Sequence, residues 1–196
     1  MPVAELSSRD DIIAPDSPSD KLISAVILGV GEYGLEMLKT LPWFGQMTGY
    51  SLKISAFDRG NSGYNRMMTE CPELMSPELN KKKIRGEAQY YIDVYREADV
   101  FSEECEKTLE GLPCITYAFV SLGDDNTNIK AAIRLRELCE RQGWNPVIQA
   151  VVHDSAKVKA LKNISNFKNQ EYRIDFVGDL DTLYSEKWML HSELDQ

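Results

Sequence analysis

The chain has 196 residues and a formal net charge of −9 at pH 7. This length suffices for one α/β domain with a substantial core and a short appendage, but not for a dinucleotide domain plus a separate catalytic domain of usual size. The acidic balance argues against nucleic acid and anionic membrane surfaces as partners. No apolar run approaches the roughly 18 residues that a membrane span requires, so we expect no membrane insertion.

The first 20 residues contain Ser, Asp and Pro and only short apolar pieces. Such a segment cannot bury enough surface to offset the entropy lost on ordering, so we expect a mobile N-terminal arm over residues 1–20. A secretory signal has a central apolar stretch, whereas this segment has acidic residues and no such stretch, so we do not expect a secretory signal here.

Four widely spaced cysteines, with no C-x-x-C pair and only two histidines in the chain, form no recognisable disulfide or zinc pattern. This usage favours buried, reduced thiols in the cytoplasm, and it predicts no metal site.

An apolar run over residues 22–28 leads directly into a Gly-x-Gly-x-x-Gly turn, Gly29-Val30-Gly31-Glu32-Tyr33-Gly34. In a dinucleotide-binding turn, Gly29 makes the tight turn after the strand and Gly31 lets the backbone approach a pyrophosphate. Gly34 lets the first helix pack closely on the sheet. A phosphate there would face the N–H groups and the positive end of the helix dipole. The turn therefore predicts a nucleotide site, and the alternative is a sheet that kept its tight turn and binds nothing.

A second apolar run, residues 52–57, ends in Asp58. An acidic residue about 20 residues beyond the glycine turn is where a ribose hydroxyl is held. A carboxylate accepts hydrogen bonds from hydroxyls and repels a 2′-phosphate, whereas Arg59 beside it could pair with that phosphate. We therefore expect NAD or NADH, or another adenine nucleotide such as ATP or ADP, to bind more tightly than NADP(H).

The rest of the chain alternates strands with helices, which predicts an α/β, doubly wound, mainly parallel six-stranded Rossmann-like sheet over residues 21–180. Strands are expected over residues 22–28, 52–57, 90–95, 115–120, 146–152 and 174–177. Helices are expected over residues 31–41 (ended by Pro42), 64–70, 103–109, from the turn at 121–125 to about 142, and 154–161. Residues 181–196 are expected to form a C-terminal helix or a connection to a further domain.

Two other segments favour particular roles. The link from Trp43 to Tyr50 is long for a βαβ unit and is expected to cover the sheet edge or to form a contact surface. The basic cluster at 81–85 is expected to be a solvated face, and the alternative is a contact with a phosphate.

Three pieces together resemble the RCK domain (regulator of potassium conductance), also called the TrkA N-terminal type of NAD-binding domain. They are residues 26–34, Asp58, and the turn Ser121-Leu122-Gly123-Asp124-Asp125-Asn126-Thr127-Asn128-Ile129. A Gly-Asp-Asp-x-x-Asn-like turn that opens a helix after the fourth strand is typical of that family. Its members usually carry a Gly-Asp-Ala-Thr-like turn after the third strand, where this chain has residues 93–99.

The resemblance covers residues 22–180 and implies a Rossmann-type module that binds NAD(H) or another adenine nucleotide as a regulatory ligand, and usually pairs into dimers. It implies that the glycine turn holds the phosphates, that Asp58 meets the adenosine ribose, and that the turn after the fourth strand lies beside the nucleotide. The predicted nucleotide contacts are Gly29, Val30, Gly31, Glu32, Tyr33, Gly34, Asp58, Arg59, Gly123 and Asp124.

Catalytic motifs give little support for an enzyme. The chain has no Gly-x-Ser-x-Gly and no P-loop, and His153 with Asp154 at the end of the fifth predicted strand are the candidates for general acid or base. The sequence therefore favours a non-catalytic, cytoplasmic, nucleotide-binding regulatory module that forms a homodimer and acts on a larger protein or a membrane-transport partner. The alternatives are a small NAD(P)-dependent oxidoreductase, or its cofactor-binding half, and an interaction domain with an empty Rossmann turn.

Overall fold

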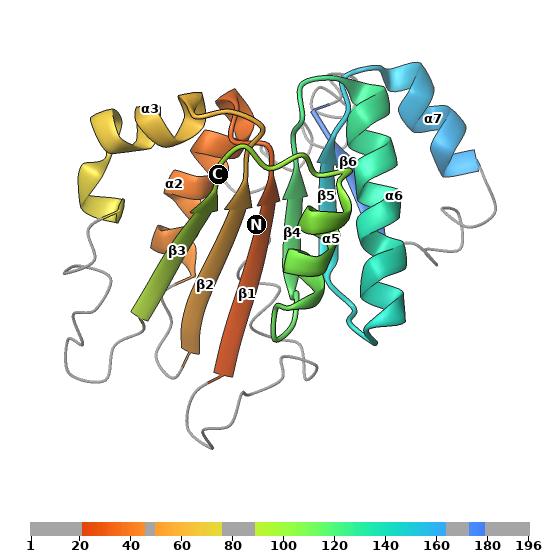
Figure 1. Cartoon of the computed structure of the whole chain (residues 1–196). Coiled ribbons are helices and arrows are strands. Elements are labelled where there is room, and N and C mark those ends of the chain that lie inside the picture. Colours follow the sequence, from red (N-terminus) through yellow and green to blue (C-terminus); the bar gives the residue numbers. More distant parts are fainter. Residues whose placement is uncertain (1–20, 46–49, 76–88, 164–172, 179–196) are drawn as a thin grey trace, which may run out of the picture.

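The computed structural model describes residues 21–45, 50–75, 89–163 and 173–178 (Figure 1). Within these ranges six strands form one sheet in the order β3-β2-β1-β4-β5-β6, and every neighbouring pair is parallel. The strands are β1 (Lys21–Leu28), β2 (Tyr50–Phe57), β3 (Gln89–Tyr95), β4 (Tyr117–Val120), β5 (Val147–Val151) and β6 (Ile174–Val177). The expected N-terminal arm, the basic cluster at 81–85 and the C-terminal segment at 181–196 lie outside the described residues.

Helices cover both faces of the sheet. The α-helices of the described residues are α2 (Glu32–Phe44), α3 (Ser62–Glu70), α5 (Glu103–Glu110), α6 (Asp125–Arg141) and α7 (Ser155–Asn163), and a 3₁₀ helix, η1, spans Pro72–Met75. Figure 1 shows α2 and α3 on one face, with α5 and α6 on the other. The fold is thus a Rossmann-like doubly wound sheet, which confirms the fold class predicted from the alternation of strands and helices.

The central strand β1 explains why the sheet has two separate apolar layers. Successive side chains of a strand point to opposite faces. Ile23, Ala25 and Ile27 pack with α2 and α3, whereas Val26 and Leu28 pack with α5 and α6. A strand buried on both faces reads as a nearly continuous apolar run, as residues 22–28 do.

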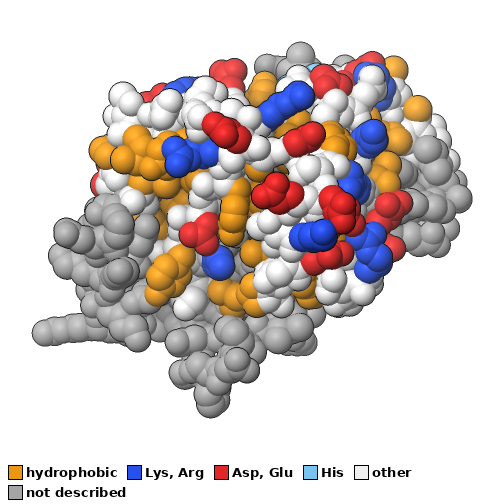
Figure 2. All heavy atoms as spheres, viewed as in Figure 1, with side chains coloured by type: hydrophobic (Ala, Val, Ile, Leu, Met, Phe, Trp, Pro, Cys, Tyr) orange, Lys and Arg blue, Asp and Glu red, His pale blue; other side chains and the backbone are white. Residues whose placement is uncertain are grey.

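Charged side chains of both signs mix over the outer surfaces of α5 and α6 (Figure 2). The excess negative charge of the chain therefore does not form a single acidic field on this face. None of the described helices is long and apolar enough to cross a membrane.

Several predicted helix boundaries differ from the structure by one to three residues, and the largest differences are at the end of α2, the start of α3 and the end of α7. Helix α2 continues to Phe44 instead of ending before Pro42. Proline in the last turn removes only one ladder hydrogen bond, and the Gly45 N–H donates to the Leu41 carbonyl at 2.8 Å, which closes the helix beyond it. Helix α3 begins at Ser62, two residues before the predicted start at residue 64.

The cysteines are free thiols, and three of them are buried: Cys105, Cys114 and Cys139. Burial raises the pKa of the Cys105 thiol to about 11 and that of Cys139 to about 12, and it also raises the pKa of Cys114. A protonated, inaccessible thiol is a poor nucleophile. Cys71 is half-buried.

We expect a thiol reagent such as Ellman's reagent to modify Cys71 first in the native protein, and the other three only after unfolding in guanidinium chloride. The change Cys71→Ser should remove the first phase and leave the second. Rapid modification of Cys105, Cys114 or Cys139 in the native protein would contradict the burial described here.

Candidate functional site

A cleft of about 410 Å³ opens at the carboxyl ends of the strands. It lies where the strand order reverses, because the chain leaves β1 toward β2 on one side and continues from β4 toward β5 on the other. Ligands of open α/β sheets bind in the crevice at this switch point. The loops that follow β1, β2, β3, β4 and β5 all contribute lining residues.

Two glycines of the glycine turn (residues 29–34), Gly29 and Gly31, line the cleft, and packing requires glycine at positions 29 and 34. Gly29 has φ +90°, and a Cβ there would lie 2.3 Å from the Ser121 carbonyl oxygen. A Cβ on Gly34 would lie 1.9 Å from the Gly29 carbonyl oxygen, because α2 approaches β1 closely. A Cβ on Gly31 would meet nothing within 4 Å. The backbone of Gly31 is therefore open to an approaching group.

The start of α2 suits an anion. Its N-cap residue is Gly31, and no side chain caps the helix, whereas at α6 the Asp124 carboxylate accepts from the Thr127 N–H at 3.0 Å. The first N–H groups of a helix have no partner within the helix, and its dipole places positive charge at that end. Exposed Glu32 lies in the same first turn and also lines the cleft.

Asp58 lies beside the glycine turn at the end of β2. Its Oδ1 accepts from the Val30 N–H at 3.4 Å, and its backbone bonds to the Tyr95 carbonyl and the Ala98 N–H. The carboxylate of half-buried Asp58 thus bonds to the turn after β1, and its backbone bonds to the end of β3 and to the loop after β3. Exposed Arg59 follows it at the edge of the cleft. Asp58 and Arg59, the two residues with opposite expected effects on the choice of cofactor, thus both line the cleft.

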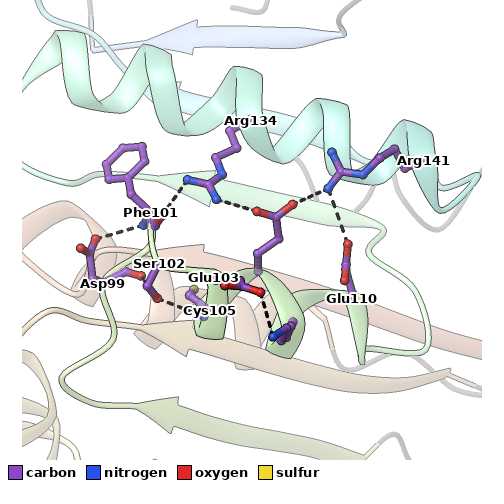
Figure 3. Close-up of polar contacts among 10 residues, drawn as sticks. Asp99, Phe101, Ser102, Glu103, Cys105, Glu110, Arg134 and Arg141 are labelled. Carbon is purple, nitrogen blue, oxygen red and sulfur yellow. Dashed lines mark hydrogen bonds and ion pairs between the residues drawn. The ribbon is translucent and has the colours of Figure 1, made fainter.

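Residues 98–101, called the cleft wall below, close one side of the cleft. Arg134 of α6 donates to the Phe101 carbonyl at 2.8 Å and to Glu106 of α5 at 2.5 Å, and Arg141 bonds the other oxygen of Glu106 (Figure 3). The hydrogen bond from Arg134 holds the pKa of Glu106 below its ordinary value. Arg134 of α6, which is itself held by Glu106 of α5, therefore anchors the backbone of the cleft wall. The sequence did not predict this anchor.

The two residues predicted as nucleotide contacts in the turn after β4, Gly123 and Asp124, differ in their surroundings. Gly123, with φ +104°, lines the cleft. Asp124 is not among the lining residues, and its carboxylate accepts from Thr127, which holds the pKa of Asp124 below its ordinary value. Val30 and Gly34 likewise lie outside the lining, because both are buried beneath the turn.

Asn128 ties the turn after β4 to the end of β5. Its side-chain oxygen accepts from the Leu122 N–H at 2.5 Å, and its side-chain nitrogen donates to the Val151 carbonyl at 2.8 Å. Leu122 and Val151 both line the cleft, so a side chain that is only 3% exposed sets the shape of this part of the cleft.

We expect Asn128→Ala to lower the free energy of unfolding by about 2–4 kcal/mol, because it leaves two backbone groups without their partner. Equilibrium unfolding in guanidinium chloride measures the change. Asn128→Asp keeps an acceptor for Leu122 but puts a carboxylate against the Val151 carbonyl, so it should also destabilise. If Asn128→Ala unfolded like the wild type, Asn128 would not hold these two segments together.

His153 and Tyr33 form the far end of the cleft. Their ring centroids lie 5.5 Å apart with an interplanar angle of 45°, and both side chains are exposed. His153 Nδ1 lies 3.2 Å from the Gly178 carbonyl oxygen. Because a carbonyl only accepts, Nδ1 carries the hydrogen in this contact and Nε2 is the acceptor of the neutral ring. The described residues contain no group of three or more His, Cys, Asp or Glu side chains arranged to hold a metal ion.

The chain matches no model of a known protein family, and a search of curated proteins finds no relative. The likeness to the RCK domain therefore rests on the three pieces of sequence quoted above. The coarse part of that likeness holds in the structure: the domain is a six-stranded parallel α/β sheet of Rossmann-like order with a cleft at its switch point.

Proposed function

We propose that this chain is a non-catalytic module that binds NAD(H) or another adenine nucleotide as a regulatory ligand. The observation that supports the proposal is the cleft at the switch point, lined by a glycine turn whose middle glycine is open to it. The start of α2, with no side-chain cap, offers N–H groups and a positive dipole end at the same place.

In this proposal the ligand lies across the carboxyl ends of the strands. The adenosine ribose donates to the Asp58 carboxylate, and the pyrophosphate lies over Gly31. The adenine lies against the cleft wall, whose apolar residues Val100 and Phe101 suit a planar base. These groups come from the loops after β1, β2 and β3, which the register of the parallel strands brings together.

A regulatory role, rather than catalysis, is the proposal because the cleft offers little chemistry. Among the described residues that line it, His153 and three carboxylates could carry a proton. The Nδ1 of His153 already contacts the Gly178 carbonyl, and the carboxylates of Asp58 and Asp99 accept from the N–H groups of Val30 and Phe101. A ligand that is not transformed acts through its different affinities for two conformations or assembly states. In this proposal the chain forms a homodimer, and the ligand-dependent change of conformation or assembly acts on a larger protein or a membrane-transport partner.

A binding panel followed by a turnover assay tests the proposal. Thermal shift and calorimetry with NAD⁺, NADH, NADP⁺, ATP and ADP should show saturable binding of at least one adenine nucleotide. The alternative of an empty Rossmann turn predicts no binding. A small oxidoreductase, which the position of His153 on the cleft favours as second candidate, predicts oxidation or reduction of a nicotinamide cofactor that His153→Ala abolishes.

We expect NAD(H) to bind at least tenfold more tightly than NADP(H), a difference of about 1.4 kcal/mol. The reason is the half-buried Asp58 carboxylate, which accepts from a ribose hydroxyl and repels a 2′-phosphate. Measured by calorimetry, the preference for NAD(H) over NADP(H) should be smaller in Asp58→Asn and larger in the matched variant Arg59→Ala. Tighter binding of NADP(H) to the wild type would mean that Arg59 decides the choice.

A further inference from the structure

The strand β3 forms one edge of the sheet and has few of the features that usually protect an edge. Among the residues that the structure describes, no strand lies beyond it (Figure 1). All seven of its residues pair with β2 without a bulge, and none of them is proline or lysine. The opposite edge strand, β6, has only four residues. Proteins usually shorten, bend or charge an edge strand to prevent it from pairing with another chain, so a long and regular edge is a candidate for such a pairing.

Alternate residues of β3 direct their backbone groups away from the sheet. In a parallel ladder, one residue turns both its N–H and its C=O to one neighbouring strand, and the next residue turns both to the other side. The Tyr95 carbonyl accepts from the Asp58 N–H at 2.9 Å, so the odd-numbered residues of β3 face β2. The backbone groups that point outward are therefore those of Tyr90, Ile92 and Val94. They form a row of donors and acceptors along this edge.

The edge is complementary to itself. Ile92 is the middle residue of β3, so a two-fold axis beside it pairs all seven residues with those of an antiparallel second copy. Ile92 then exchanges N–H and C=O bonds with Ile92 of the second copy, and Tyr90 does the same with Val94 of the second copy. The side chains of these three residues pack with the core on the α2–α3 face, so this pairing joins the apolar layers of the two copies.

The charges on the opposite face favour the same register. In it, Tyr91, which is 41% exposed, lies opposite Asp93 of the second copy at a pair without hydrogen bonds, where side chains come closest. The Asp93 carboxylate lies 3.6 Å from the Lys53 ammonium, which balances part of its charge. A two-fold axis at Asp93 would instead place two carboxylates directly opposite each other, and like charges in that position destabilise a strand pair.

From the regular edge, the outward backbone groups and the side-chain pairs, we infer that β3 is the interface of a homodimer in which two copies join antiparallel into one continuous sheet. This surface lies outside the cleft, and the inference shares only the homodimer with the proposed function. Because the two β3 strands run in opposite directions, the two clefts open toward opposite sides of the dimer. An interface made mainly of two strands buries a small area, so we expect the dimer to dissociate on dilution.

Sedimentation equilibrium and residue-resolved amide hydrogen exchange on the full chain, both over a dilution series, test this interface. At high protein concentration we expect twice the monomer mass and slow exchange at the outward N–H groups of Tyr90, Ile92 and Val94. On dilution the mass should fall to that of the monomer and these N–H groups should exchange faster. Those of Tyr91 and Asp93, which face β2, should stay protected throughout. This alternation identifies the edge of β3, because an interface elsewhere would not produce it.

Charge variants test the register. Tyr91→Asp places a carboxylate opposite Asp93 of the second copy in two symmetric pairs, so we expect the dimer to weaken by about fivefold to thirtyfold. Tyr91→Asn, which is uncharged and of similar size, is the matched control and should weaken it less. The double variant Tyr91→Asp, Asp93→Lys places opposite charges across the axis and should restore the dimer. Circular dichroism checks that each variant is folded.

Other outcomes would assign the edge to another occupant or to none. A protein that stays monomeric at the highest concentration, with fast exchange at the outward N–H groups, overturns the inference and leaves the edge to a strand of a different protein. Slow exchange there in a protein of monomer mass also overturns it, because another segment of the same chain would then cover the edge. A dimer that Tyr91→Asp does not weaken uses another surface. Nucleotide binding, measured separately by calorimetry, decides the proposed function independently of these results.

Discussion

Gly31→Val is expected to abolish nucleotide binding while the protein stays folded. Gly31 has a negative φ of −75° (ψ −153°), so it does not need the left-handed backbone that favours glycine, and no atom lies within 4 Å of the added Cβ. The branched side chain instead occupies the cleft in front of the first N–H groups of α2. We expect the affinity to fall by at least about 100-fold, or about 2.8 kcal/mol.

Calorimetry measures the loss of binding, and thermal unfolding followed by circular dichroism measures the fold. Replacing a glycine N-cap by valine costs about 1 kcal/mol of stability, so a modest decrease in melting temperature is part of the expected result. Unchanged affinity in Gly31→Val would remove the glycine turn from the binding site. A protein that no longer folds would mean that the open space at Gly31 is needed for more than a ligand.

The same turn predicts the opposite outcome three residues later. Gly34→Ala should lower the free energy of unfolding by about 3 kcal/mol or more, because its Cβ would lie 1.9 Å from the Gly29 carbonyl oxygen and 2.9 Å from the Ser121 hydroxyl. The carbonyl belongs to the backbone of the tight turn and cannot rotate away, so α2 must move off the sheet. A loss of this size is a large fraction of the total stability of a small domain.

Gly31→Ala is the matched control, since it makes the same chemical change in the same turn. A Gly-to-Ala change within a helix ordinarily stabilises by roughly 0.5–1 kcal/mol, so any loss at Gly34 reports the close contact and not a helix propensity. Equilibrium unfolding in guanidinium chloride gives both values. Wild-type stability in Gly34→Ala would show that α2 can shift without cost, and the close approach would then not explain the glycine.

Gly29 and Gly34 show which parts of the structure the sequence could predict. The spacing Gly-x-Gly-x-x-Gly between an apolar run and a helix is a local pattern, and it predicted both the tight turn at Gly29 and the close packing at Gly34. The alternation of apolar runs with helical segments is also local, and it predicted the doubly wound sheet.

The parts that escaped prediction depend on contacts between distant segments. Phe101 reaches the cleft because Arg134, 33 residues away, bonds its carbonyl, and no pattern near residue 101 carries that information. The Tyr33–His153 pair likewise joins α2 to the end of β5. Asp124 could be either a helix cap or a ligand contact on the sequence alone, since one carboxylate suits both, and the structure has it as a cap.

The cleft wall also bears on how this domain changes over evolutionary time. Arg134 contacts the backbone carbonyl of residue 101, so the side chain at 101 can be exchanged without loss of the anchor. Arg134 and Glu106, by contrast, recognise each other through side chains. An alignment of divergent relatives should therefore show positions 106 and 134 substituted as a pair, while position 101 varies among the apolar side chains that suit the proposed adenine contact. A turn anchored in this way keeps its shape after its sequence motif has disappeared, which makes its descent hard to trace by motif alone.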